Sequence, residues 1–129
     1  MNFPKSVYVA GCMRGMPLYN FQAFADVAMT LRGYDIIVYS PAERDMANGF
    51  QPHLALDDPD QHFNLEEAFT WDFWAIAESD AIVLLPGWET SDGTKKEIIL
   101  AQGMGKQIFA YNSGLLEPIT PRIEVEVTS

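Results

Sequence analysis

Two carboxylates stand out in this sequence because their surroundings favour chemistry. Asp72 falls in line with Leu65, Phe69 and Ile76 at helical spacing, which places a carboxylate on an otherwise apolar stripe. Burying a carboxylate is costly unless it is paired, and such an environment raises its pKa. The alternative interpretation places Asp72 at the margin of the stripe, where its carboxylate caps a loop in a purely structural role.

Glu97 is the second carboxylate, and two interpretations of it stay open. In Thr94-Lys95-Lys96-Glu97 it fits a capping box, in which its side chain accepts a hydrogen bond from the Thr94 N–H. The functional interpretation places Glu97 at the start of a helix that faces a ligand crevice. There the helix dipole would keep the carboxylate ionised and available as a nucleophile.

A cation follows the first apolar run, in Gly11-Cys12-Met13-Arg14-Gly15. The glycines would let a ligand approach the backbone closely, but the pattern is neither a dinucleotide fingerprint nor a Walker loop. Taken alone, Arg14 is more typical of a surface ion pair. Cys12 could act as a nucleophile, but no histidine lies near it in the sequence, which favours a small packed thiol.

Two further groups of residues are weaker candidates. Five possible metal ligands share one polar loop without a recognised spacing, so we interpret them as a solvated loop: His53, Asp57, Asp58, Asp60 and His62. Three aromatic residues, Trp71, Phe73 and Trp74, occur together on one predicted helix. Core packing is the default interpretation for them, with base stacking by one of them as the alternative.

Strand and helix patterns alternate along the chain and must position these residues. Strands are predicted over 6–10, 35–39, 81–85 and 107–111, with a fifth at an edge over 123–127. Helices are predicted from an Asn20 cap to Gly33, from an Asn64 cap onward, and over 94–104, with a long surface loop over 43–63. The alternation predicts an α/β fold, a three-layer Rossmann-like or flavodoxin-like parallel sheet of four to five strands with helices on both faces. Ligands then bind beyond the carboxyl ends of the strands.

The composition limits the classes of partner. The chain has 129 residues, 48% of them apolar, which predicts a single domain over residues 1–129. Eighteen acidic residues against eight basic ones give a net charge of −10, and no Lys or Arg occurs between Arg44 and Lys95. This balance argues against a nucleic-acid polymer or an anionic membrane as partner, while one small phosphate needs only a few donors. The single cysteine and the lack of a long apolar run predict a soluble, cytoplasmic protein.

Taken together, the motifs resemble those of the nucleoside 2-deoxyribosyltransferase superfamily. Within it they are most similar to the 2′-deoxynucleoside 5′-phosphate N-hydrolases, and phage-associated relatives carry the same pattern. The resemblance spans positions from Val7 to about Tyr111. The motifs that carry it are, in order, Tyr8-x-x-Gly11-x-x-Arg14-Gly15, Asp72 and Ser91-x-Gly93-x-x-x-Glu97.

The resemblance implies a role for each matching residue. Glu97 corresponds to the nucleophile that attacks the anomeric carbon, and Tyr8 and Asp72 to residues that position the nucleophile, the sugar or the departing base. The remaining positions correspond to contacts with the 5′-phosphate and the turns around it: Gly11, Arg14, Gly15, Ser91 and Gly93. No cofactor and no metal are implied, and superfamily members commonly form homodimers or larger homo-oligomers.

Three functions therefore remain in view. The first is hydrolysis of the N-glycosidic bond of (deoxy)nucleoside 5′-monophosphates, which releases free base and sugar phosphate. The second is base exchange by a nucleoside deoxyribosyltransferase, and the third is a non-catalytic nucleotide-binding module. Two departures bear on the phosphate: Cys12 stands where the hydrolases often have serine, and Asp92, beside Ser91, would repel a dianion.

Overall fold

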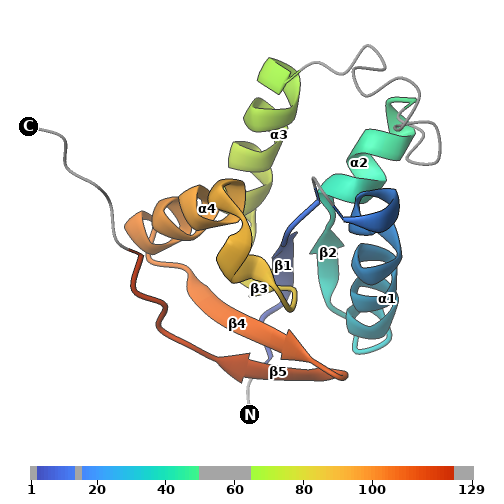
Figure 1. Ribbon diagram of the computed structural model, residues 1–129. Coiled ribbons are helices and arrows are strands. Elements are labelled where there is room, and N and C mark those ends of the chain that lie inside the picture. The colour runs from blue at the N-terminus through green and yellow to red at the C-terminus, as the bar shows by residue number, and fades with distance from the viewer. Residues whose placement is uncertain (1–2, 14–15, 50–64, 124–129) are drawn as a thin grey trace, which may run out of the picture.

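The computed structural model describes residues 3–13, 16–49 and 65–123 and forms one sheet covered on both faces (Figure 1). The strand order is β2-β1-β3-β4-β5, in which the first four strands are parallel and β5 is antiparallel to β4. The predicted α/β fold is confirmed. The strands are β1 (Ser6–Ala10), β2 (Ile37–Tyr39), β3 (Ala81–Leu84), β4 (Gln107–Asn112) and β5 (Leu115–Pro118).

Helices connect the parallel strands and cover the two faces of the sheet (Figure 1). α1 packs on one face, and α3 and α4 pack on the other. Each connection between parallel strands therefore carries at least one helix, as parallel pairing requires. The α-helices are α1 (Phe21–Arg32), α2 (Pro41–Ala47), α3 (Leu65–Glu78) and α4 (Asp92–Gly103), and short 3₁₀ turns span Pro17–Asn20 and Trp88–Thr90.

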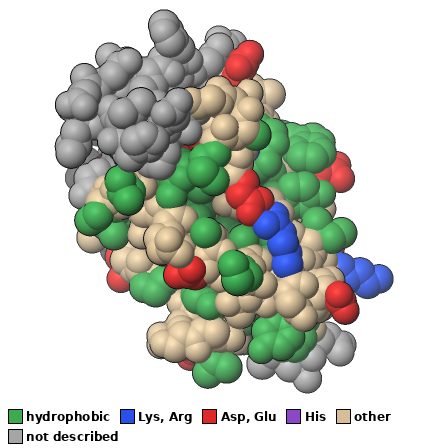
Figure 2. Space-filling view, turned by 90° about the vertical axis from the view of Figure 1, so that its right-hand side faces the viewer, with side chains coloured by type: hydrophobic (Ala, Val, Ile, Leu, Met, Phe, Trp, Pro, Cys, Tyr) green, Lys and Arg blue, Asp and Glu red, His purple; other side chains and the backbone are tan. Residues whose placement is uncertain are grey.

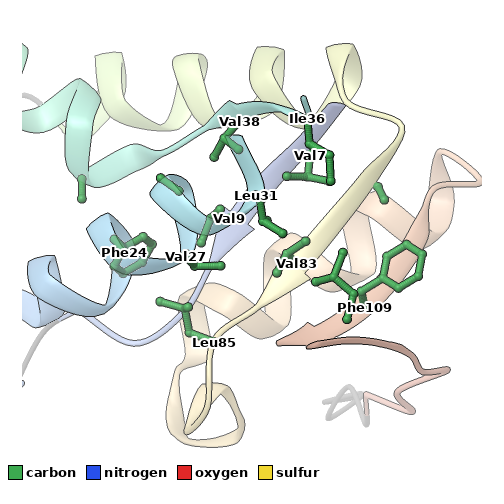
Figure 3. Close-up of a cluster of buried hydrophobic side chains, with 14 of the residues drawn as sticks. Val7, Val9, Phe24, Val27, Leu31, Ile36, Val38, Val83, Leu85 and Phe109 are labelled. Atoms are coloured by element: carbon green, nitrogen blue, oxygen red, sulfur yellow. The ribbon is translucent and has the colours of Figure 1, made fainter. Parts of the chain in front are cut away.

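The alternation of side chains along β1 decides which residues meet which helices. Val7 and Val9 point into the core under α1, together with Val83 and Leu85 (Figure 3). Because successive side chains of a strand point to opposite faces, Tyr8 belongs to the second core, with residues of α3 and α4. All five residues of β1 are buried, as expected for a central strand of a covered parallel sheet.

Three features differ from the sequence predictions. The predicted loop over 43–63 begins instead within a helix, α2, which Pro41 opens at its first turn, a position that favours proline. The strand at the edge beside β4 is β5, and Ile123 lies outside any strand, while residues 124–127 of the predicted strand lie outside the described residues. Asn20 does not cap α1 with its side chain, which instead donates to the Cys12 carbonyl oxygen at 3.0 Å.

An ion pair fixes α2 against α1. The Arg32 guanidinium donates to both carboxylate oxygens of Glu43, at 2.5 and 2.6 Å, and also to the Val38 carbonyl oxygen at 2.9 Å. On the side of the molecule that carries α1, basic side chains are sparse among acidic and scattered hydrophobic ones (Figure 2). Among the described helices, none has the length and apolar character needed to cross a bilayer.

Position 11 must be glycine because Leu85 packs directly against it. A Cβ at Gly11 would lie 2.8 Å from the Leu85 Cβ, which is too close for two carbon atoms and cannot be relieved by rotating a side-chain end. A Cβ at Gly93 would meet only the Ser91 Oγ, at 4.0 Å.

We expect Gly11→Ala to lower the free energy of unfolding by about 1–3 kcal/mol, because it overpacks the core. Gly93→Ala is the matched control and should leave stability unchanged or raise it by about 0.5–1 kcal/mol, since glycine is unfavourable in a helix. Urea denaturation followed by circular dichroism measures both. A Gly11→Ala protein as stable as the parent would show that β1 and Leu85 are not packed this closely.

Candidate active site

Tyr8 joins two helices through its hydroxyl group. The Tyr8 hydroxyl donates a hydrogen bond to the Glu97 Oε2, and it also hydrogen-bonds the Asp72 carboxyl group. The three side chains come from β1, α3 and α4, which are far apart in the sequence. The structure thus brings together the three residues that the sequence assigned to catalysis.

The Tyr8 hydroxyl keeps its proton in this setting. Burial raises the pKa of Tyr8 well above its usual range, and the nearby Glu97 and Asp72 carboxylates raise it further. Its aromatic ring is buried, with 1% of the residue exposed, and lies 6.3 Å from the Trp71 ring. Tyr8 is therefore a fixed, protonated hydroxyl beside both carboxyl groups, and it donates its single proton to Glu97.

Asp72 lies on the buried side of α3, as the helical spacing predicted. Ala68, Ala75 and Ile76 of the same helix are buried around it, whereas Phe69, which the spacing also placed on this stripe, is exposed. Burial raises the pKa of Asp72 to about 6, although the hydrogen bond from Tyr8 works in the opposite direction. A carboxyl group with this pKa can hold a proton close to neutral pH.

Glu97 differs from the prediction in its ionisation. Burial raises the pKa of Glu97 to about 8, and the negative charge of Asp72 adds to this rise. Ser91 caps α4, so Glu97 lies in the second turn of the helix, beyond the reach of the dipole that was expected to keep it ionised. The capping-box alternative is wrong, because the Thr94 N–H donates to the Ser91 Oγ at 3.1 Å.

The two carboxyl groups must be considered as a pair, since each affects the ionisation of the other. With pKa values of about 6 and about 8, the pair carries one proton and one negative charge in the interval between them. One carboxylate and one carboxylic acid side by side are the two groups that glycosidic bond cleavage needs.

Two residues of α2 were missed by the sequence analysis. Burial raises the pKa of Asp45 to about 6, and the Arg44 guanidinium lies 3.4 Å from its carboxylate. The charges of both residues act on Asp72, Asp45 raising its pKa and Arg44 lowering it. The Ser40-Pro41 pair is a helix-start signal that could have revealed α2 inside the predicted loop.

The structure describes some, but not all, of the residues that were expected to contact a phosphate. The Ser91 Oγ accepts hydrogen bonds from the Thr94 N–H and, at 2.9 Å, from the Thr94 hydroxyl, which leaves its own proton available to a ligand. Gly93 lies in the first turn of α4 rather than in a tight turn, and Gly87 is the glycine of this connection with a positive φ, 89°. Arg14 and Gly15 lie outside the described residues.

The structure also bears on the weaker candidates, which are the possible metal ligands, the aromatic residues of α3 and Cys12. The possible metal ligands from His53 to His62 and the helix cap at Asn64 fall outside the described residues. The default of core packing holds only for Trp71, which is partly buried against the core under α3 and α4. Phe73 and Trp74 are 54% and 48% exposed. Cys12 is partly buried.

An open pocket of about 1160 Å³ lies near Asp72, since Arg44, whose charge acts on Asp72, lines it. It lies where β2 ends, between α2 and α3, and Trp71, which contacts Tyr8, forms part of its wall. Other lining residues are Tyr39, Ser40, Arg44, Thr70 and Trp74.

The raised pKa of Glu97 predicts a pH-dependent stability. Between about pH 4.5 and about pH 8 the folded protein keeps a proton that the unfolded chain has released, so the free energy of unfolding falls as the pH rises. Glu97→Gln, which cannot ionise, should therefore melt at a higher temperature than the parent above about pH 8, and this advantage should vanish below about pH 5.

Thermal melts across this pH range measure the effect. Glu78→Gln, which removes an exposed carboxylate of α3, is the control and should leave the pH dependence of the parent unchanged. Equal melting temperatures of parent and Glu97→Gln above about pH 8 would contradict the burial of an ionisable Glu97.

Comparison with known proteins identifies a sequence family and two structures of similar fold. No protein of curated function matches the sequence. Among solved structures, the CMP N-glycosidase BcmB from Clostridium botulinum is 24% identical over 82% of this chain and 70% of that protein, with a TM-score of 0.55. BlsM is 23% identical, with a TM-score of 0.58, over 83% of this chain and 64% of that protein, so the chain spans less than two thirds of it.

These likenesses show that the chain shares the fold of both proteins. The sequence family described as "Domain of unknown function (DUF4406)" matches residues 5–110, which is most of the chain and includes β1, α3 and α4. The chain belongs to the DUF4406 family.

Proposed function

We propose that this protein hydrolyses the N-glycosidic bond of (deoxy)nucleoside 5′-monophosphates, with Glu97 as nucleophile and Asp72 as general acid. The observation that carries the proposal is the convergence of Tyr8, Asp72 and Glu97 from three elements on one hydroxyl group. A fold shared with a CMP N-glycosidase supports the same class of reaction.

The reaction uses the form of the pair in which Asp72 holds the one proton and Glu97 is ionised. Because the pKa of Glu97 is the higher of the two, the proton must pass from Glu97 to Asp72 before the attack. The Glu97 carboxylate attacks the anomeric carbon as the C1′–N bond breaks, and Asp72 gives its proton to the departing base. The Tyr8 hydroxyl donates to the Glu97 Oε2 and holds the carboxylate in place for the attack. Water then attacks the sugar ester, Asp72 takes a proton from that water, and Glu97 leaves as carboxylate. The products are free base and sugar 5-phosphate.

The start of α4 supports a site for the 5′-phosphate. The first backbone N–H groups of a helix have no partner within it and carry partial positive charge, so they favour an anion. The Ser91 hydroxyl, which caps α4, can donate its proton to the same group. The Asp92 side chain is exposed and can turn toward solvent, which limits its repulsion of the phosphate.

The first test measures the two carboxyl groups separately. We expect Glu97→Gln to lower kcat for release of base by roughly a thousandfold or more, because it removes the nucleophile. Asp72→Asn should lower kcat by about 10²–10⁴-fold on natural nucleotides, because general acid catalysis contributes that much. With para-nitrophenol as leaving group, which needs no protonation, Asp72→Asn should retain most of its activity.

Chromatography of free base and sugar phosphate provides the measurement, and Glu78→Gln is the control with expected parental activity. A parent protein that binds nucleotides without releasing base would overturn the proposal and favour a binding module. Release of base only when a second base is supplied would favour a transferase.

The second test uses the pH profile. The state with one proton on the pair predominates between about pH 6 and about pH 8, so kcat/KM should follow a bell with limbs near those values. The Tyr8 hydrogen bond lowers the pKa of both carboxyl groups. Tyr8→Phe should therefore move both limbs to higher pH, whereas a purely structural role for Tyr8 would lower activity without moving them.

A further inference from the structure

The pocket beside the carboxyl groups has an aromatic wall. The Trp74 ring meets the Tyr39 ring edge-on, with centroids 5.5 Å apart and an angle of 84° between planes. Both residues line the pocket, as does Trp71, whose ring lies 6.3 Å from that of Tyr8. Trp71 therefore joins the wall of the pocket to Tyr8 of the carboxyl site.

Polar groups stand in the same pocket. Arg44 lines it, and the Arg44 side chain is only 11% exposed, with one of its nitrogen atoms 3.4 Å from the Asp45 carboxylate. The guanidinium group has five N–H donors in a fixed planar fork, so donors remain for a ligand. Ser40 is 3% exposed, and its Oγ is buried without a hydrogen-bond partner among the residues that the structure describes.

The charges around the pocket favour an uncharged ligand. Carboxylates of Glu43 and Glu67 line it, and Asp45 and Asp72 lie close to Arg44. These four acidic groups outnumber the two guanidinium groups paired with them, Arg32 on Glu43 and Arg44 on Asp45, and would repel a phosphate dianion. A planar, neutral heterocycle with hydrogen-bonding groups on its edge fits both the aromatic wall and the polar groups.

The guanidinium fork selects among the bases. Arginine forms two parallel hydrogen bonds with two neighbouring acceptors, such as O6 and N7 of guanine. Cytosine offers neighbouring acceptors at O2 and N3, whereas uracil and adenine have a donor beside each acceptor on their hydrogen-bonding edges. Carboxylates accept from exocyclic amines, which guanine and cytosine both carry.

We propose that this pocket holds the nucleobase and that Arg44 selects cytosine or guanine by donating to their two neighbouring acceptors, with Ser40 as a further contact and Trp74 and Trp71 as the apolar wall. The choice of ligand rests on the proposed function, because it takes the base to belong to a nucleotide whose sugar reaches Glu97.

The test measures binding without turnover. In a Glu97→Gln background, calorimetric titration with cytidine, guanosine, uridine and adenosine monophosphates should show the first two binding roughly tenfold or more tighter. Arg44→Met should abolish this difference. Arg44→Lys keeps the charge beside Asp45 and so guards against misfolding, but it lacks the planar fork and should also lose the preference. Arg122→Met, which removes an exposed cation outside the pocket, is the control and should keep it.

Binding preference and release of base can be lost independently of each other. Equal binding of the four nucleotides, or a preference that survives in both Arg44 variants, would overturn the role of Arg44 even if the parent releases base. A preference that depends on Arg44 in a protein that releases no base would support the pocket and overturn the hydrolase. Loss of all binding in Arg44→Lys, with its folding intact by circular dichroism, would indicate a phosphate site instead.

Discussion

The hydrogen bond between the Tyr8 hydroxyl and Glu97 is the interaction on which the site depends. It is possible only because Tyr8 is a buried residue of the central strand and points away from α1, toward α3 and α4. The low polarity of this core makes ionisation of both neighbouring carboxyl groups unfavourable, so one proton stays with the pair. The packing that stabilises the sheet thus also sets the protonation state that the proposed chemistry uses.

The site divides into parts with different physical requirements. The carboxyl pair is partly buried beside the second core, and the start of α4 at Ser91 and Asp92 is closer to the surface. The pocket at the end of β2 adjoins the pair through Trp71. In the proposed function, the sugar of the nucleotide would lie at the carboxyl pair, between a base in the pocket and a phosphate at the start of α4.

The sequence predicted the strands and the carboxyl residues well, because both leave periodic signals. The spacing of Asp72 relative to Ile76 placed it correctly on the buried side of its helix, and short apolar runs located four of the five strands. The ionisation of Glu97 could not be predicted in this way, since it depends on the position of the cap at Ser91 and on burial by segments distant in sequence. The pocket was missed for a related reason: α2 has only seven residues, too few to show a period.

The brevity of β2 has a consequence for association between molecules. β2 has three residues, and it is an outer strand of the sheet, with exposed Ile37 at its start. A long open edge offers its unpaired backbone groups to a strand of another molecule, and a short one offers very few. Because the chain turns at Ser40 into α2, the end of the strand that creates the pocket also leaves little backbone on which a foreign strand could add and begin aggregation.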